Sequence, residues 1–100
     1  MSSKRETIEI LAKLVAEHLG KPWGHYREEN DGLIHAVTGG WAIDYNKYYG
    51  GYEIQEISSK TGGTIVIGGG RKTAGEMIAF LNGMLVMVRL ETDIRIRETP

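Results

Sequence analysis

The stretch of sequence that decides the fold is WAIDYNKYYGGYEIQEI, residues 41–57. It contains two segments rich in aromatic and β-branched residues, Trp41–Asn46 and Tyr52–Ile57, which are separated by Gly50 and Gly51. Paired glycines adopt the positive φ angles that tight hairpin turns need, so the two segments are predicted to be antiparallel strands. In the second segment Ile57 breaks the alternation of apolar residues, which indicates a bulge or an early end of the strand.

Further strands are expected on both sides of this hairpin, because similar segments alternate with glycine-centred turns. The candidate strands are Trp23–Glu29 and Leu33–Thr38 before the hairpin and Thr64–Ile67 after it. Short connections favour antiparallel neighbours, so the sequence predicts a meander of three to five strands. Three consecutive glycines, Gly68–Gly70, are expected to end the sheet region.

A helix is predicted before the strands. Ser3 and Glu6 have the spacing of a capping box, and apolar residues follow at helical spacing as far as Leu19. Gly20 suits the left-handed residue that ends a helix. The first helix is therefore expected over Lys4–Leu19.

A second helix is predicted after the strands. Thr73 and Glu76 form another capping box, and the apolar pattern that follows predicts a helix from Ala74 to Val88 or Leu90. The last ten residues, 91–100, include five charged side chains and are expected to form a flexible tail rather than a short edge strand.

These patterns predict one α+β domain over residues 1–100, with an N-terminal helix, an antiparallel meander and a long C-terminal helix packed on one sheet face. Two domains are excluded because halves of about 50 residues would be too small to bury separate cores. The expected core combines a broad apolar stripe of the second helix with residues of the first helix and the sheet: Met77, Ile78, Leu81, Met84, Leu85, Val88, Leu11, Val15, Ile43 and Ile54.

The second helix is apolar around much of its circumference. Phe80, Val86 and Met87 lie outside the stripe that faces the expected core. One small sheet and one helix cannot cover so much apolar surface, so a homodimer through these three residues is expected.

The charge balance disfavours nucleic acid and membranes as partners. Twelve basic and thirteen acidic residues give a net charge of −1, which provides no attractive field for polyanions. The most apolar window, residues 77–90, is too short to cross a bilayer. The absence of cysteine excludes disulfides and thiolate sites and fits a reducing compartment, so a cytoplasmic location is expected.

No catalytic residue, metal ligand set or cofactor is predicted, and the protein is not expected to be an enzyme. His18, His25 and His35 lack the mutual spacing of a metal site, and no nucleophile, base and orienting group can be assembled from the sequence. His35 is expected opposite Glu28 across a hairpin, as a polar cross-strand pair.

Arg71, Lys72 and Thr73 follow the three glycines at the start of the second helix, where backbone N–H groups attract anions. They are therefore candidate contacts for an anion or a nucleic acid. The spacing matches neither a P-loop nor a dinucleotide-binding motif, so a flexible strand-to-helix connection is the simpler interpretation.

An aromatic cluster is the most informative feature. Tyrosine offers apolar area with a polar tip at small entropic cost, which suits a protein-binding surface. The alternative is that Trp41, Tyr45 and Tyr52 form one packed sheet face, with Tyr48 and Tyr49 in its turn. The candidate partner-binding residues are Tyr45, Lys47, Tyr48, Tyr49 and Tyr52.

The segment from Trp41 to Leu85, with its Tyr-Gly-Gly-Tyr hairpin, second glycine turn and capped apolar helix, resembles a set of small phage and prophage proteins. That group carries no assigned chemistry, so the resemblance implies no functional residue. It implies an accessory protein that acts on a host or phage protein.

The order helix, three strands, helix is also that of double-stranded RNA-binding domains, and Arg71 and Lys72 are reminiscent of the basic start of their second helix. Two basic residues release few counterions, so RNA binding is the alternative function rather than the preferred one.

Overall fold

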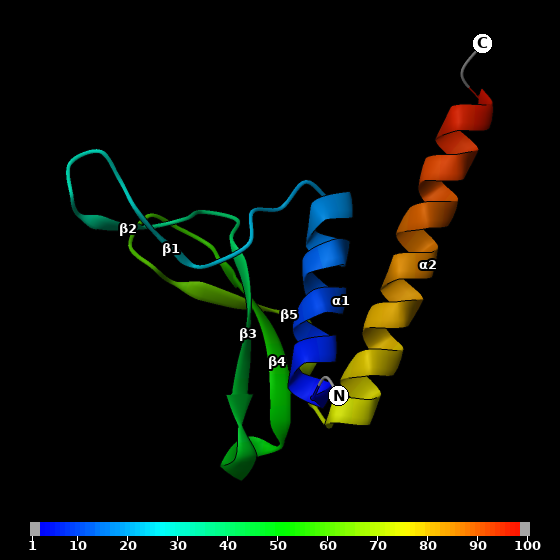
Figure 1. Ribbon diagram of the computed structural model, residues 1–100, viewed down its shortest axis with the longest axis horizontal. Coiled ribbons are helices and arrows are strands. Elements are labelled where there is room, and N and C mark those ends of the chain that lie inside the picture. Colours follow the sequence, from blue (N-terminus) through cyan, green and yellow to red (C-terminus); the bar gives the residue numbers. More distant parts are fainter. Residues whose placement is uncertain (1–2, 99–100) are drawn as a thin grey trace.

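The computed structural model describes the backbone of residues 3–98 and the side chains of residues 3–91. In this part of the chain, five strands lie between two α-helices in sequence order (Figure 1). The elements are α1 (Lys4–His18), β1 (Tyr26–Glu28), β2 (Ile34–Ala36), β3 (Trp41–Asn46), the 3₁₀ turn η1 (Lys47–Tyr49), β4 (Gly51–Ile57), β5 (Thr64–Lys72) and α2 (Ala74–Glu98). The predicted α+β class is confirmed.

Both helices begin at the capping residues that the sequence indicated. The Ser3 side chain accepts a hydrogen bond from the backbone N–H of Glu6 at 3.1 Å. At α2 the capping box is reciprocal, since Thr73 Oγ1 accepts from the Glu76 N–H at 3.2 Å and Glu76 Oε1 accepts from the Thr73 N–H at 3.0 Å. These bonds satisfy N–H groups that have no partner within the helix.

The main sheet has three antiparallel strands in the order β3-β4-β5. Ile43 pairs with Ile54, and Tyr45 pairs with Tyr52, which confirms the hairpin read from residues 41–57. A bulge or early strand end was expected at Ile57. The irregularity instead lies between Tyr52 and Ile54, where the register of β4 against β5 shifts.

The three glycines do not end the sheet, which corrects the prediction. Strand β5 runs through them to Lys72, so that Ile54 pairs with Ile67 whereas Tyr52 pairs with Lys72. On β4 a single residue separates Tyr52 from Ile54, whereas on β5 residues 68–71 separate their partners. The positive φ angles of the glycines (84°, 83° and 113°) allow this bulge, which side chains other than glycine would oppose.

Strands β1 and β2 form a separate two-stranded hairpin and are shorter than predicted. Their described side chains are almost all exposed, so little burial is available to lengthen them. In this hairpin Arg27 lies opposite His35, and Glu28 lies opposite Ile34. The predicted pairing of His35 with Glu28 is therefore wrong by one residue, and His35 instead contacts Asp31.

The two helices lie side by side and run in the same direction along one face of the main sheet (Figure 1). Helix α2 packs chiefly on α1, and both helices contact strands of the sheet. Much of the predicted core is confirmed: Val15, Ile54, Met77, Leu81 and Leu85 are buried, and the other predicted positions are partly buried against them. The core also includes Ile8, Ala12, Ala16 and Trp41.

Helix α2 is longer than predicted and continues past Leu90 to Glu98 (Figure 1). No glycine or proline interrupts residues 84–98, so nothing in that segment breaks the helix. Most of the expected C-terminal tail is thus helical backbone, and its last two residues lie outside the described part of the chain. Within that part, no helix combines the length and apolar character that a membrane crossing requires.

Candidate protein-binding site

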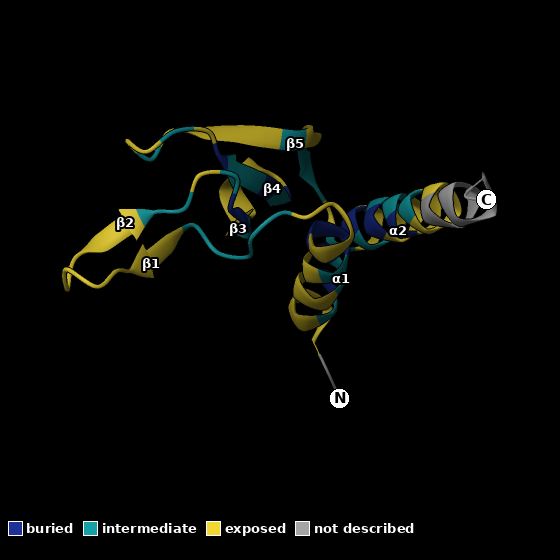
Figure 2. Ribbon diagram, turned by 90° about the horizontal axis from the view of Figure 1, so that it is seen from above, coloured by how far each residue is buried: buried dark blue, intermediate teal, exposed yellow. Residues whose placement is uncertain are grey.

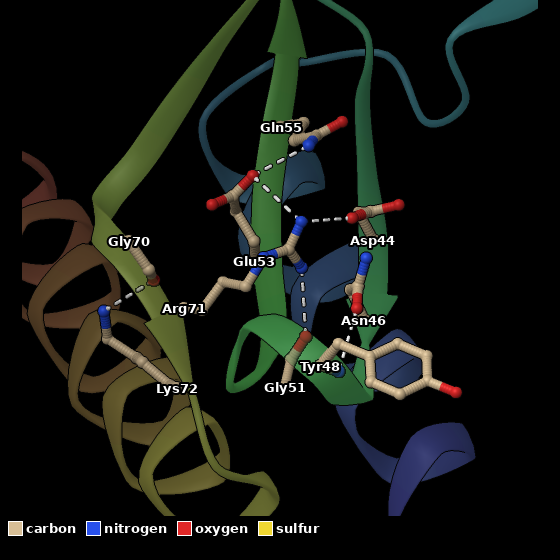
Figure 3. Close-up of polar contacts among 9 residues, drawn as sticks. All are labelled: Asp44, Asn46, Tyr48, Gly51, Glu53, Gln55, Gly70, Arg71 and Lys72. Atoms are coloured by element: carbon tan, nitrogen blue, oxygen red, sulfur yellow. Dashed lines mark hydrogen bonds and ion pairs between the residues drawn. The ribbon is translucent and has the colours of Figure 1, made fainter.

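The candidate site is the tip of the β3–β4 hairpin, which we call the tyrosine tip and define as Tyr45, Lys47, Tyr48, Tyr49 and Tyr52. Tyr48 and Tyr49 lie in η1 and are 83% and 75% exposed, and Tyr45 is 46% exposed. Figure 3 shows the Tyr48 ring projecting away from the sheet. The hairpin therefore presents aromatic rings to solvent.

Local contacts hold the backbone of this tip. The Asn46 side chain accepts a hydrogen bond from the Tyr48 N–H at 2.9 Å and so caps η1. Gly51 has a φ of 112°, and a Cβ built on it would lie 2.5 Å from the carbonyl oxygen of Lys72. Only glycine fits between the tip and the end of β5, which ties the hairpin closely to the start of α2.

Arg71 braces the tip from the neighbouring strand (Figure 3). Its guanidinium donates to the Gly51 carbonyl at 3.0 Å and to Asp44 Oδ2 at 2.6 Å, and it lies 3.8 Å from Glu53 Oε1. Its side chain is 19% exposed. The side chain thus links β5 to both strands of the hairpin, which places the predicted anion contact in a structural role.

Lys72 and Thr73 are engaged as well. The Lys72 ammonium donates to the carbonyls of Gly68 and Gly70 at 2.5 and 3.3 Å and lies 4.7 Å above the Phe80 ring. Thr73 caps α2. All three candidate anion contacts therefore use polar groups within the chain, although they lie beside the tyrosine tip.

Tyr45 and Tyr52 form a tilted ring pair, with centroids 4.8 Å apart. Together with Lys47, Gly51 and Thr73 they line a shallow hollow of about 400 Å³ between the tip and the start of α2. Lys47 lies 5.1 Å from the Tyr48 ring and provides the nearby positive charge of the tip. The hollow therefore lies beside the exposed residues Tyr48 and Tyr49 of the same hairpin.

The aromatic cluster is divided between the core and the surface. Trp41 is buried, and its indole N–H donates to Glu56 Oε1 at 2.8 Å. This bond, assisted by Lys21 at 3.2 Å, lowers the pKa of the Glu56 carboxyl. Tyr48 and Tyr49 lie in the turn, as the packed-face alternative also expected. Of the three residues that it placed on one packed face, Trp41 is buried and Tyr45 pairs with Tyr52, but Tyr45 is 46% exposed.

A polar hollow of about 380 Å³ lies by the β1–β2 hairpin and is lined by Glu29, Asp31, His35 and Lys60, among others. Asp31 accepts from the Leu33 N–H at 2.9 Å and contacts His35 Nε2 at 2.8 Å, and both bonds lower the pKa of Asp31. In the part of the chain that the structure describes, no three histidine or carboxylate side chains gather as a metal would need.

Sequence reasoning missed the residues that brace the tip. Asp44 and Glu53 face each other in the β3–β4 register, and directly opposed carboxylates repel. That pairing was readable once the hairpin was aligned, and it indicates that a cation must lie between them. Arg71 supplies this charge from β5.

The chain was compared with family models, with curated proteins and with solved structures, and none of the three comparisons found a match.

Proposed function

We propose that the protein is a small non-enzymatic accessory protein of the phage type, acting in the cytoplasm, that binds a host or phage protein through the tyrosine tip. The observation that carries the proposal is the exposure of Tyr48 and Tyr49 on a braced hairpin. The sequence resemblance supports the phage setting, and the absence of cysteine supports a reducing compartment.

Tyrosine at such a site favours a protein partner on physical grounds. Its ring buries a large apolar area, its hydroxyl forms hydrogen bonds, and few torsions are lost on binding. The cap by Asn46 and the brace by Arg71 reduce the ordering cost further, because the backbone of the tip is already held. The tip thus has the composition and stiffness of a binding hot spot.

Comparative affinity capture tests the proposal. The wild-type protein, Tyr49→Ala and Tyr26→Ala are each used as bait in nuclease-treated host lysate. Tyr26 is 61% exposed on the other hairpin, so Tyr26→Ala is a matched control. A stoichiometric protein that wild type and Tyr26→Ala retain and Tyr49→Ala loses supports the proposal. A protein retained equally by all three baits overturns it.

Nucleic-acid binding is the alternative function, and the order α1, β3, β4, β5, α2 favours it. The engagement of Arg71 and Lys72 within the chain counts against it, because phosphate contacts need accessible cations. Affinity for double-stranded RNA that falls steeply from low to physiological salt would establish this alternative. Salt-independent capture of a protein would exclude it as the main activity.

We further propose self-association through α2. Val86 and Met87 are 56% and 66% exposed, whereas Phe80 is partly buried beneath Lys72. Neighbouring exposed apolar side chains on a helix favour association in water. Sedimentation equilibrium over a hundredfold range of concentration tests this, and a species of 11.1 kDa throughout would contradict it.

A further inference from the structure

An apolar groove runs along α2 near the end of α1. It has a volume of about 450 Å³ and is lined from α2 by Ala79, Phe80, Gly83, Met84 and Met87, and from the end of α1 by Leu19. Met87 of this lining and its neighbours Val86 and Leu90 on α2 are each more than half exposed. The groove can hold a row of apolar side chains, and α2 itself carries such a row.

The chain exposes more surface than a folded monomer of its size. Its accessible surface is 6856 Å², whereas a monomer of 11.1 kDa is expected to expose about 5,700 Å². Its radius of gyration is 15.2 Å, against about 13 Å for a compact chain of this length. Each partner in a stable complex buries about 800 Å², so the surplus is large enough for one such interface.

Part of the exposed surface lies on α2, which extends beyond α1 (Figure 1). Strands β1, β2 and β5 are largely exposed as well (Figure 2). The 25 residues of α2 span about 37 Å and the 15 residues of α1 about 22 Å. A helix end with no tertiary support is only marginally stable in water. The part of α2 that projects beyond α1 therefore gains most from a partner that packs along it.

Gly83 lines the groove, and the fold of a single copy does not require glycine at this position. A Cβ built there meets no atom within 4 Å, and its φ is not in the left-handed region. Glycine inside a helix costs stability relative to alanine, so a gain elsewhere is expected to offset it. Close packing of a second helix would be such a gain, because the second helix can approach closely only where no side chain projects.

We infer that the occupant of this groove is the α2 helix of a second copy, packed antiparallel so that Leu90 of each copy lies over Gly83 of the other. This inference rests on the self-association proposed above. Groove and exposed row belong to the same helix, so a twofold axis between Val86 and Met87 fills both grooves at once. In this register the Met87 side chains of the two copies meet Val86 across the axis.

A double-mutant cycle on the full chain tests the register. Gly83→Leu fills the groove floor and places a leucine against Leu90 of the second copy, so the dimer dissociation constant should rise at least tenfold. Leu90→Ala should also weaken the dimer. The double variant moves the leucine from one side of the contact to the other, so it should recover most of the wild-type affinity.

Gly75→Ala is the matched control, because Gly75 is also in α2, also has open space around its Cβ position and lies outside the groove. Its dimer affinity should equal that of the wild type. A wild-type protein that stays monomeric overturns both the self-association and the inference. A wild-type dimer that Gly83→Leu leaves intact, or a double variant no better than the single ones, overturns the inference alone.

Discussion

Arg71 and Asp44 lie on the two outer strands of the main sheet, and their side chains meet across the central strand at 2.6 Å. This ion pair spans β4 and also neutralises Glu53, the carboxylate that faces Asp44 in the register. Sheet and tyrosine tip thus share one polar brace, which makes the stability of the fold and the shape of the tip depend on the same guanidinium.

Arg71→Ala should lower the free energy of unfolding by about 1–3 kcal/mol, because it leaves Asp44 and the Gly51 carbonyl without their side-chain donor and Glu53 without its ion-pair partner. Lys47→Ala removes a positive charge from the exposed side of the same tip and should cost less than about 0.5 kcal/mol. Urea unfolding of both variants measures the difference. Equal midpoints would show that the brace adds nothing to stability.

Leu81→Ala should cost about 2–5 kcal/mol, because Leu81 is fully buried between the helices and the sheet and its truncation leaves a cavity. Ile10→Ala is the control, since Ile10 is an apolar helical residue that is 59% exposed. The control should change the denaturant midpoint little. A Leu81→Ala effect as small as that of Ile10→Ala would contradict the assigned core.

Gly68→Ala should cost more than Gly69→Ala. Both glycines have φ angles near +84°, so alanine is strained at either position by about 1–2 kcal/mol. At Gly68 the new Cβ would also lie 2.5 Å from the Phe80 ring, whereas at Gly69 it meets nothing within 4 Å. Thermal unfolding of the two variants gives the comparison. Equal costs would mean that the Phe80 ring moves aside freely.

Stability should fall as the pH drops below about 4.5. The folded-state pKa of Glu56 is lowered, first by the hydrogen bond from Trp41 and then by Lys21. A lowered carboxyl pKa contributes stability above its unfolded value, and this is lost as the pH falls through the folded value. The carboxyls of Asp31 and Glu76 are shifted in the same direction.

Titration of the Glu56 carboxyl by NMR identifies the cause of this shift. Trp41→Phe removes the indole donor and should raise the Glu56 pKa more than Lys21→Ala does, because the Trp41 bond has the larger effect. Lys60→Ala removes an exposed lysine that does not contribute to the shift of the Glu56 pKa, so it serves as the control. The reverse order of the two shifts would show that the ion pair dominates the hydrogen bond.

Local signals in the sequence were sufficient for most of the fold. The two capping boxes, the turn at Gly50 and the periodicity of the helices depend on residues within a few positions of one another, so they are readable without a structure. The bulge in β5 was not predictable from the sequence. A glycine indicates an unusual backbone angle but does not show whether strand pairing resumes after it.

The tyrosines of the candidate site were predictable from the sequence, but the contacts that hold the tip in place were not. The position of Tyr48 and Tyr49 follows from the hairpin alone. The engagement of Arg71 depends on a contact between residues far apart in sequence, which only the register of three strands reveals. Its position after three glycines at a helix start placed this residue among candidate ligand contacts, whereas its partners are groups of the chain itself.

The parallel packing of α1 against α2 has a consequence for synthesis of the chain. The helices lie at opposite ends of the sequence and share one core, so Ile8, Val15 and Trp41 stay without their cover until α2 has left the ribosome. Contacts of such long sequence separation also form late, since the intervening loop must close first. The newborn chain therefore cannot complete this core before α2 has left the ribosome, and until then its first helix offers an apolar face to chaperones.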